Sequence, residues 1–337
     1  MNKIRIAIVG IGNIGKRHIA VIDADPNTVL SGICDINEDK CQTQSDLYNG
    51  IPIYTDFNKM FDEVEADVIS ICSPHYLHKS MTLAAIEKGF NVLVEKPMAL
   101  KVEDAQEMID AANKKGVKLY VVKQNRFNVP VKLVKEVIDE GRLGKVYMVQ
   151  CNVLWNRNTE YYTESDWRGN KTKEGGALFT QVSHFIDLMI WLFGSVIEAK
   201  ANIETLKHDI EVEDSGVATL KFDSDVLGSV LWTTCVYNKN HEGSITIIGE
   251  KGTIKIGGQY LNKIDFWDVE SFPLPNNINF VDLPNNYGKY QGTSSNHDKV
   301  IKELVKDMNN QSGNTVLGDE GIKSIEAIQM IYDNAKH

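Results

Sequence analysis

Short apolar runs alternate with helical stretches through the first 145 residues of the chain. The runs IRIAIVG, VLSGICD, ADVISICSP, NVLVEKP and VKLYVV read as strands, and segments such as 77–88 and 102–115 lie between them as helices. Strands of continuous Val and Ile are buried on both faces, which is typical of a parallel sheet covered by helices. Residues 1–123 are therefore predicted to form a doubly wound α/β domain.

The pattern changes after about residue 145. The runs VYMVQCNVLW, GVATLKF, VLGSVLWTTCV and GSITIIGEKGTIKI alternate between apolar and polar positions, and one apolar helix is predicted at about 176–193. Alternation indicates a sheet with one face against the protein and one face free for a partner. We expect residues 124–337 to form a second α+β domain around a large, open, mostly antiparallel sheet, with the C-terminal helix packing back on the first domain.

Composition limits the class of partner. The chain has 337 residues, 42% of them hydrophobic, and a formal net charge of −10. Two domains fit this length, and the acidic balance argues against nucleic acid or an anionic membrane as the main partner. No apolar run approaches the roughly 18 residues of a membrane span, and the N-terminus enters a strand rather than a signal segment. We expect a cytoplasmic protein that binds a small molecule; its five scattered cysteines suggest neither disulfides nor metal.

The stretch GIGNIG lies between a predicted strand and a predicted helix. Gly10 allows a tight turn, Gly12 lets the backbone approach a pyrophosphate, and Gly15 lets the helix pack closely on the strand. The helix N-terminus then faces phosphate with free N–H groups. Asp35 ends the next strand, where it can accept both ribose hydroxyls and repel a 2′-phosphate, or simply cap the helix that follows. The pattern predicts an NAD-binding Rossmann domain over residues 1–123, with NAD preferred to NADP.

Several further motifs carry a resemblance to a known family. They are SPHYLH (73–78), EKP (95–97), QNRFN (124–128), EGRLGKV (140–146) and EGGALFTQVSHFIDLMIWLFG (174–194). Together they resemble the Gfo/Idh/MocA oxidoreductases over nearly the whole chain. LWNRNTEYYTESDWRG (154–169), Gln181 before His184 and the tail GDEGIKSIEAIQMIYDNA are most similar to the WlbA/WbpB-type nucleotide-sugar 3-dehydrogenases.

That resemblance implies a reaction. Enzymes of this branch oxidise the 3-hydroxyl of UDP-linked N-acetylglucosamine or its uronic acid, ahead of amination, for surface polysaccharide or lipid A precursors. NAD is the implied cofactor, no metal is implied, and a homodimer or homotetramer through the C-terminal sheet is expected. Whether C6 of the sugar is an alcohol or a carboxylate, and whether NADH is recycled in place by 2-oxoglutarate, stay open.

Two residues are predicted to be catalytic. Lys96 ends a strand at the edge where open α/β folds bind ligands, and His184 begins an apolar helix. Oxidation of a hydroxyl needs a base with a pKa near neutrality, which favours His184 as the base and Lys96 as its partner, with the reverse assignment possible. Many family members carry an aspartate where this chain has Thr180. This difference argues against assigning the polyol-dehydrogenase mechanism of those members to this chain.

Binding residues are assigned from the motifs and from chemistry. Arginine can grip phosphate and aromatic rings can stack on uracil, although a strand-edge cluster explains such residues equally well. The predicted cofactor-binding residues are Gly10, Gly12, Asn13, Ile14, Gly15, Asp35, Ile36, Ser73, Pro74, His78, Glu95, Lys96, Asn125, Trp167 and Arg168. The predicted substrate-binding residues are Lys96, Arg126, Arg157, Tyr161, Tyr162, Thr180, Gln181 and His184.

Two other functions compete with this prediction. A polyol or free-sugar dehydrogenase of the same family is disfavoured by Thr180 and by the aromatic and basic segment 154–169. A non-catalytic NAD(H)-binding regulator is disfavoured because both Lys96 and His184 are present. His75 and His78 have metal-like spacing, but no carboxylate or cysteine cluster accompanies them, so a helix start beside the cofactor is the preferred interpretation.

Overall fold

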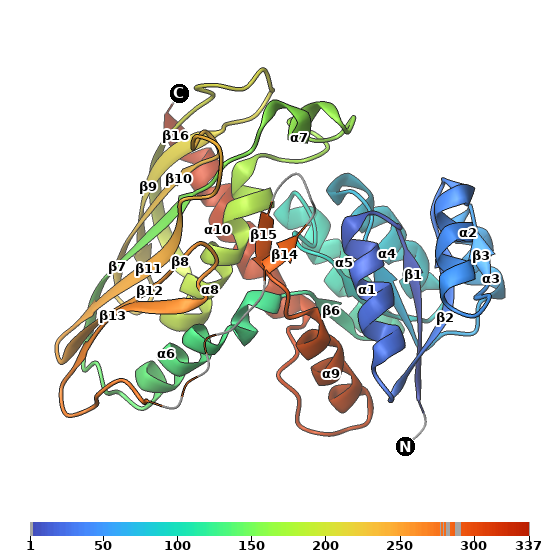
Figure 1. The fold of residues 1–337 in the computed structure, drawn as a ribbon, viewed down its shortest axis with the longest axis horizontal. Helices are drawn as coiled ribbons and strands as arrows, with labels where there is room; N and C mark the ends of the chain where they lie inside the picture. The colour runs from blue at the N-terminus through green and yellow to red at the C-terminus, as the bar shows by residue number, and fades with distance from the viewer. Residues whose placement is uncertain (1–2, 277, 279, 281–283, 287–290, 337) are drawn as a thin grey trace. The chain divides into compact units, whose positions relative to one another are not determined.

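The computed structural model describes residues 3–276, 278, 280, 284–286 and 291–336 (Figure 1). The chain divides into two compact units. The first consists of Met1–Lys123 and His297–Ile325, and the second of Gln124–Asn296 and Glu326–His337. Each unit is described by itself. No helix in the described part of the chain is both long and apolar enough to cross a membrane.

A six-stranded parallel sheet forms the centre of the first unit. Its order is β3-β2-β1-β4-β5-β6, so the chain starts in the middle of the sheet, builds outward to one edge and then to the other. This is the strand order of dinucleotide-binding folds, and the predicted Rossmann domain is confirmed. The strands are β1 (Ile4–Val9), β2 (Thr28–Cys34), β3 (Ile53–Tyr54), β4 (Val68–Ile71), β5 (Asn91–Val94) and β6 (Leu119–Val121).

Helices of the first unit begin and end at residues suited to those positions. The Asn37 side chain accepts the Lys40 N–H at the start of α2, and Gly116 ends α5 in the left-handed conformation. The helices are α1 (Asn13–Ala24), α2 (Glu38–Leu47), α3 (Phe57–Glu63), η1 (His75–Leu77), α4 (His78–Glu87), α5 (Val102–Lys115) and α9 (His297–Met308), with α10 (Gly318–Asp333) divided between the units.

The segment 297–325 joins the first unit through hydrogen bonds to β6. Asp307, in α9, accepts the Tyr120 hydroxyl at 2.5 Å and the Lys118 ammonium at 2.6 Å. The Val121 N–H donates to the Val316 carbonyl at 2.8 Å. Residues 124–337 are predicted to form the second domain, with the C-terminal helix packing back on the first; the contacts group the whole of 297–325 with the first unit, because this segment pairs beside the edge strand β6.

An eight-stranded sheet dominates the second unit. Its order is β13-β12-β11-β7-β10-β9-β8-β16, with β7 and β10 parallel, β8 and β16 parallel, and the other neighbours antiparallel. The predicted α+β class with a mostly antiparallel sheet is confirmed. The strands are β7 (Val146–Leu154), β8 (Val196–Glu204), β9 (Ser215–Phe222), β10 (Leu227–Thr233), β11 (Glu242–Gly249), β12 (Gly252–Gly257), β13 (Lys263–Val269) and β16 (Ala335–Lys336), beside the pair β14 (Pro284–Asn286) and β15 (Gln291–Ser294).

One face of this sheet is covered and the other is open. Helix α8 runs along the covered face (Figure 1), where Phe185 packs edge-on against Trp155 at 5.7 Å between ring centroids. In β10 the residues Val230 and Trp232 point to this face and are buried. The helical segments of this unit are η2 (Gln124–Phe127), α6 (Val129–Asp139), α7 (Thr159–Thr163), the π-helical turn η3 (Leu178–Val182) and α8 (Ser183–Phe193).

Candidate active site

The glycine loop after β1 has the geometry of a phosphate-binding turn. Gly10 has φ +95°, and a Cβ there would lie 2.7 Å from the Cys72 carbonyl carbon. A Cβ at Gly15 would lie 1.9 Å from the Gly10 oxygen, so α1 can approach β1 only with glycine at this position. A Cβ at Gly12 would meet no atom within 4 Å. Gly12 therefore leaves open space before the N-terminus of α1, where Asn13 and Ile14 form the first turn.

Asp35 lies beside this loop. Its carboxylate accepts the Ile11 N–H at 2.7 Å and the Asn37 N–H at 3.0 Å, so it joins the glycine loop to the residues after β2. Ile36, between these two contacts, is 93% exposed. A carboxylate held here disfavours a second negative charge nearby, which fits an unphosphorylated ribose rather than a 2′-phosphate.

Residues after β4 and β5 are tied together by His78. Its Nδ1 lies 2.7 Å from the Pro97 carbonyl oxygen and its Nε2 lies 2.9 Å from the Ser73 carbonyl oxygen. The ring is fully buried, so it holds Ser73, after β4, and Pro97, after β5, in fixed positions relative to each other. The Ser73 hydroxyl oxygen is buried without a hydrogen-bond partner among the described residues.

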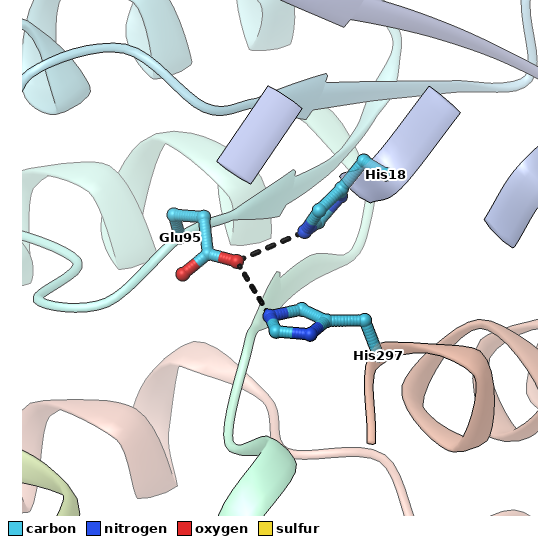
Figure 2. A group of neighbouring side chains, drawn as sticks. All are labelled: His18, Glu95 and His297. Carbon is cyan, nitrogen blue, oxygen red and sulfur yellow. Dashed lines mark hydrogen bonds and ion pairs between the residues drawn. The ribbon is translucent and has the colours of Figure 1, made fainter. Parts of the chain in front are cut away.

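Lys96 follows β5 and is joined to Pro97 by a cis peptide bond. Its backbone N–H donates to Oε2 of the preceding Glu95 at 3.1 Å. The other Glu95 oxygen faces two imidazoles, those of His18 and His297 (Figure 2). Glu95 is predicted to bind the cofactor; its side chain is buried and accepts hydrogen bonds from within the protein, including the one from the Lys96 backbone.

These features fit an NAD site. The loops after β1, β2, β4 and β5 meet at the carboxyl edge of one parallel sheet, where open α/β folds bind ligands. The open space at Gly12 suits a pyrophosphate, and the Asp35 carboxylate suits the hydroxyls of a ribose. The unpaired Ser73 hydroxyl can hydrogen-bond a further polar group of the ligand. Buried polar atoms are nearly always hydrogen-bonded, so an unpaired one here points to a ligand.

In the second unit, a π-helical turn leads into α8. Thr180 and Gln181 lie in η3, and His184 lies in the first turn of α8, where it is buried. Single π-helical turns inside helices are rare and are frequent at functional sites. The Gln181 amide donates to the Tyr161 hydroxyl at 3.1 Å, which joins the segment 154–169 to this turn.

Two buried carboxylates hold the turn, and neither was singled out from the sequence. Glu213 accepts the Leu178 N–H at 3.0 Å and the Tyr332 hydroxyl at 2.9 Å. Burial raises the pKa of the Glu213 carboxyl to about 7, although both donors favour the ionised form. Glu174 accepts the Thr180 hydroxyl at 3.1 Å, and burial raises the pKa of this carboxyl as well. Glu174 belongs to the EGG before the predicted helix, whereas nothing in the EVED stretch around Glu213 indicates a contact with that helix.

Arg126, which is predicted to bind substrate, forms a bidentate ion pair with Asp187. The Nε–Oδ2 distance is 2.8 Å, the Nη2–Oδ1 distance is 2.7 Å, and both side chains are buried. This pair fixes η2 against α8, three residues from His184. The neighbouring Asn125 amide is buried, and neither its oxygen nor its nitrogen has a hydrogen-bond partner in the described part of the chain. That unpaired amide fits its predicted role in ligand binding.

The aromatic and basic residues of segment 154–169 pack against one another. Arg168 lies 4.1 Å from the Tyr161 ring centroid, with the Trp167 ring at 5.5 Å. Arg157 donates to the Asn156 carbonyl oxygen at 2.6 Å and lies over the Tyr161 ring at 5.3 Å. The segment therefore places two cations around one ring.

Tyr162 is the member of this group with the clearest structural role. Its hydroxyl lies 3.1 Å from the Thr234 hydroxyl, and its ring packs on His208 at 4.8 Å between centroids. Its side chain is buried in these contacts, which gives it a part in packing. Burial raises the pKa of the Tyr162 phenol, so the hydroxyl stays neutral.

Comparison with known proteins assigns the class. Residues 4–123 match the NAD-binding Rossmann fold of the GFO/IDH/MocA oxidoreductase family, and residues 131–255 match the GFO/IDH/MocA C-terminal domain. The chain belongs to the Gfo/Idh/MocA family of NAD-dependent oxidoreductases, so the predicted family, enzyme class and cofactor are confirmed.

Two solved structures and one curated enzyme are similar to this chain over nearly its whole length. The structure is similar to that of the WlbA dehydrogenase from Bordetella pertussis in complex with NADH and UDP-GlcNAcA, with TM-score 0.89, 36% identity, and coverage of 99% of this chain and 96% of that one. The WlbA dehydrogenase from Chromobacterium violaceum, also with NADH and UDP-GlcNAcA, has TM-score 0.89 and 35% identity over 99% of this chain and 94% of that one. Glucose-6-phosphate 3-dehydrogenase from Bacillus subtilis (strain 168) is 26% identical over 98% of this chain and 95% of its own length.

Proposed function

We propose that the protein oxidises the 3-hydroxyl of a UDP-linked N-acetylamino sugar, UDP-N-acetylglucosamine or its uronic acid, to the 3-keto sugar with NAD. The observation that carries this proposal is the likeness to two structures solved with NADH and UDP-GlcNAcA, at 35–36% identity over 99% of the chain. The likeness to glucose-6-phosphate 3-dehydrogenase, over 98% of the chain, is weaker at 26%. We place the product in the synthesis of surface polysaccharide or lipid A precursors, the role the resemblance implies.

Specific residues in the first unit would hold the cofactor. The N-terminus of α1 and the open space at Gly12 would receive the pyrophosphate, and Asp35 the adenosine ribose. The unpaired Ser73 hydroxyl would add a hydrogen bond. The oxidised nicotinamide, when bound, supplies the hydride acceptor.

His184 and Lys96 would handle the proton. We assign His184 as the base that removes the proton from the 3-hydroxyl, because an imidazole titrates near neutrality. Lys96 would hydrogen-bond the same oxygen, and the reverse assignment gives the same products. Replacing either residue by alanine should lower turnover by about 10² or more with NAD binding nearly unchanged, because the two groups act in proton transfer.

The aromatic and basic segment would hold the nucleotide part of the substrate. Arg157 and Arg168 lie around the Tyr161 ring, and Gln181 is hydrogen-bonded to the Tyr161 hydroxyl. A diphosphate bound by the two arginines would therefore be coupled to the turn that carries Thr180. Binding energy from a part of the substrate remote from C3 can then align the 3-hydroxyl. Free sugars should therefore lose turnover as well as affinity.

The test is NADH production at equal concentrations of UDP-N-acetylglucosamine, its uronic acid, N-acetylglucosamine, glucose 6-phosphate, glucose and myo-inositol, with UDP added as a competitor. We expect turnover of a UDP-sugar and inhibition by UDP. Robust turnover of a free polyol, free sugar or sugar phosphate without UDP inhibition would assign a polyol or free-sugar dehydrogenase instead. Tight NADH binding with no turnover of any sugar would favour a regulator.

We further propose that the open face of the eight-stranded sheet is an interface between copies of this chain. The register aligns Met148, Leu227 and Ile248 across three strands, and Leu231 beside Val217. All five side chains are exposed, and a contiguous apolar patch on a sheet is typical of an interaction surface. Leu231→Asp should shift the mass measured by light scattering toward the monomer; an unchanged mass for both this variant and Met148→Asp would exclude this face.

A further inference from the structure

A buried group of three ionisable side chains is joined to the backbone of Lys96. The Glu95 Oε1 atom is 2.9 Å from His18 Nε2 and 3.4 Å from His297 Nε2, and all three side chains are buried (Figure 2). The other carboxylate oxygen accepts the backbone N–H of Lys96 at 3.1 Å. One carboxylate therefore joins the two imidazoles to the backbone of the predicted catalytic lysine.

The three residues come from three elements that bear on the site. His18 lies in α1, the helix that follows the glycine loop, and its Nδ1 lies 2.9 Å from the Ser70 hydroxyl of β4. Glu95 follows β5. His297 is the first residue of α9, where the chain returns to the first unit. The cluster thus fixes the end of β5 to the dinucleotide-binding helix and to the returning segment.

The charges of the cluster balance. Burial disfavours a charged ring at His18, but the Cys72 sulfur and the Glu95 carboxylate outweigh it and raise the pKa of His18 to about 10. Burial also disfavours an ionised Glu95, yet hydrogen bonds from both imidazoles hold the pKa of this carboxyl well below its usual range. Burial lowers the pKa of His297 and outweighs the opposing effect of Glu95; the charges of His18 and Arg17 add to the lowering. Together with the 2.9 Å contact between His18 and Glu95, these directions describe an ion pair of these two side chains beside an uncharged His297.

We propose that His18, Glu95 and His297 are positioning residues: they immobilise the carboxylate that holds the Lys96 backbone, and the His18 cation cancels the negative charge beside Lys96. An uncompensated Glu95 anion would stabilise the lysine ammonium and hold back the neutral amine. The direct 2.9 Å contact between His18 and Glu95 favours an ion pair over a metal site, because the ring nitrogen points at the carboxylate oxygen.

The two halves of the ion pair have opposite predicted effects on Lys96. His18→Asn leaves the Glu95 anion uncompensated and should raise the pH at which Lys96 becomes reactive, by about one pH unit. Glu95→Gln removes the nearer negative charge and should lower that pH. The double variant carries neither charge and should fall between them. A role in packing alone would not move the two single variants in opposite directions.

The measurement is competitive acetylation of the ligand-free protein over a pH series, with the labelling midpoint of the Lys96 peptide read by mass spectrometry. The inference rests on the proposed function for the role of Lys96, but this labelling needs no substrate. A failed substrate assay with opposite labelling shifts therefore refutes only the proposed function. Asp307→Asn is the matched control, because it weakens the attachment of α9 to β6 without touching Glu95, and it should leave the Lys96 midpoint unchanged.

Three results would overturn the proposal. The first is midpoints that stay unchanged, or move in the same direction, in the His18 and Glu95 variants. The second is a stoichiometric divalent metal in the purified protein that is lost in His297→Asn, which would make the cluster a metal site. If the variants do not fold, imidazole ¹⁵N shifts of the wild-type protein decide: a His18 ring protonated on both nitrogens at pH 8 supports the proposal, and a neutral ring overturns it.

Discussion

Removing the Arg126 guanidinium should cost mainly stability rather than substrate affinity. Arg126→Gln leaves the Asp187 carboxylate buried without its bidentate partner, since the two side chains are 8% and 5% exposed and joined at 2.7 and 2.8 Å. Breaking one side of such a buried pair costs about 3–5 kcal/mol of unfolding free energy. For a unit of this size, about 2–4 °C is lost per kcal/mol, so the melting temperature should fall by roughly 6–20 °C.

The chain offers a matched control for this substitution. Arg5 forms the same fork-like contact with Asp67, at 3.3 Å from Nε and 2.9 Å from Nη2, but the two side chains are 43% and 31% exposed. Arg5→Gln should lower the melting temperature far less than Arg126→Gln, because exposed pairs are screened by solvent. Replacing Arg126 and Asp187 together by Met and Leu should recover much of the lost stability.

The assay is thermal and urea unfolding of all three variants, followed by UDP competition at a temperature where each is folded. The reasoning is refuted if Arg126→Gln melts no lower than Arg5→Gln yet weakens UDP competition tenfold or more. That result would restore the role in substrate binding that the sequence predicts for Arg126.

Three further outcomes are expected. Gly12→Ala should keep the melting temperature but lose NADH binding, measured by fluorescence titration, whereas Gly15→Ala should destabilise the first unit because its Cβ would collide with the Gly10 oxygen; equal effects would contradict the assigned roles. Asp35→Ser should lower the NAD to NADP affinity ratio by on the order of a hundredfold, measured by calorimetry. The pKa of Glu213 is about 7 in the folded protein and 4.5 in the unfolded chain, so the buried neutral carboxyl stabilises the folded state fully below pH 4.5. This contribution of up to about 3 kcal/mol is lost as the pH rises through 7. Glu213→Gln should therefore flatten the fall in melting temperature between pH 5 and 8.

Local patterns in the sequence were enough to predict the fold of the first unit and the role of its glycine loop. Gly10, Gly12 and Gly15 are neighbours in the chain, and their roles follow from a turn between one strand and one helix. Continuous apolar runs likewise predicted a parallel sheet because both of its faces are covered. In the second unit, the alternation of apolar and polar residues predicted the exposed and buried faces of the strands. The same alternation occurs in parallel and antiparallel strands, so it could not predict that β7 pairs with β10 in parallel.

Contacts between distant residues account for what the sequence did not predict. Arg126 and Asp187 are 61 residues apart, and an arginine beside an asparagine in QNRFN reads equally well as a phosphate ligand. His297 lies 202 positions after Glu95, and nothing in its own segment indicates a buried imidazole. Segment 297–325 follows the second domain in the chain, and its contacts with β6 and with the His18–Glu95 pair show that it belongs to the first unit.

The contacts of Thr180 weaken its use as evidence against a polyol dehydrogenase. Thr180 lacks the carboxylate that many family members carry there, and this absence counted against a polyol dehydrogenase. In the folded unit, Glu174 places a buried carboxyl group 3.1 Å from the Thr180 hydroxyl, so a carboxyl group remains one hydrogen bond from that position. The choice between substrates therefore depends less on Thr180 than on Gln181 and Tyr161, whose hydrogen bond links the η3 turn to the segment that we propose holds the nucleotide. Dependence of turnover on the UDP group is accordingly the property that separates the two enzyme functions.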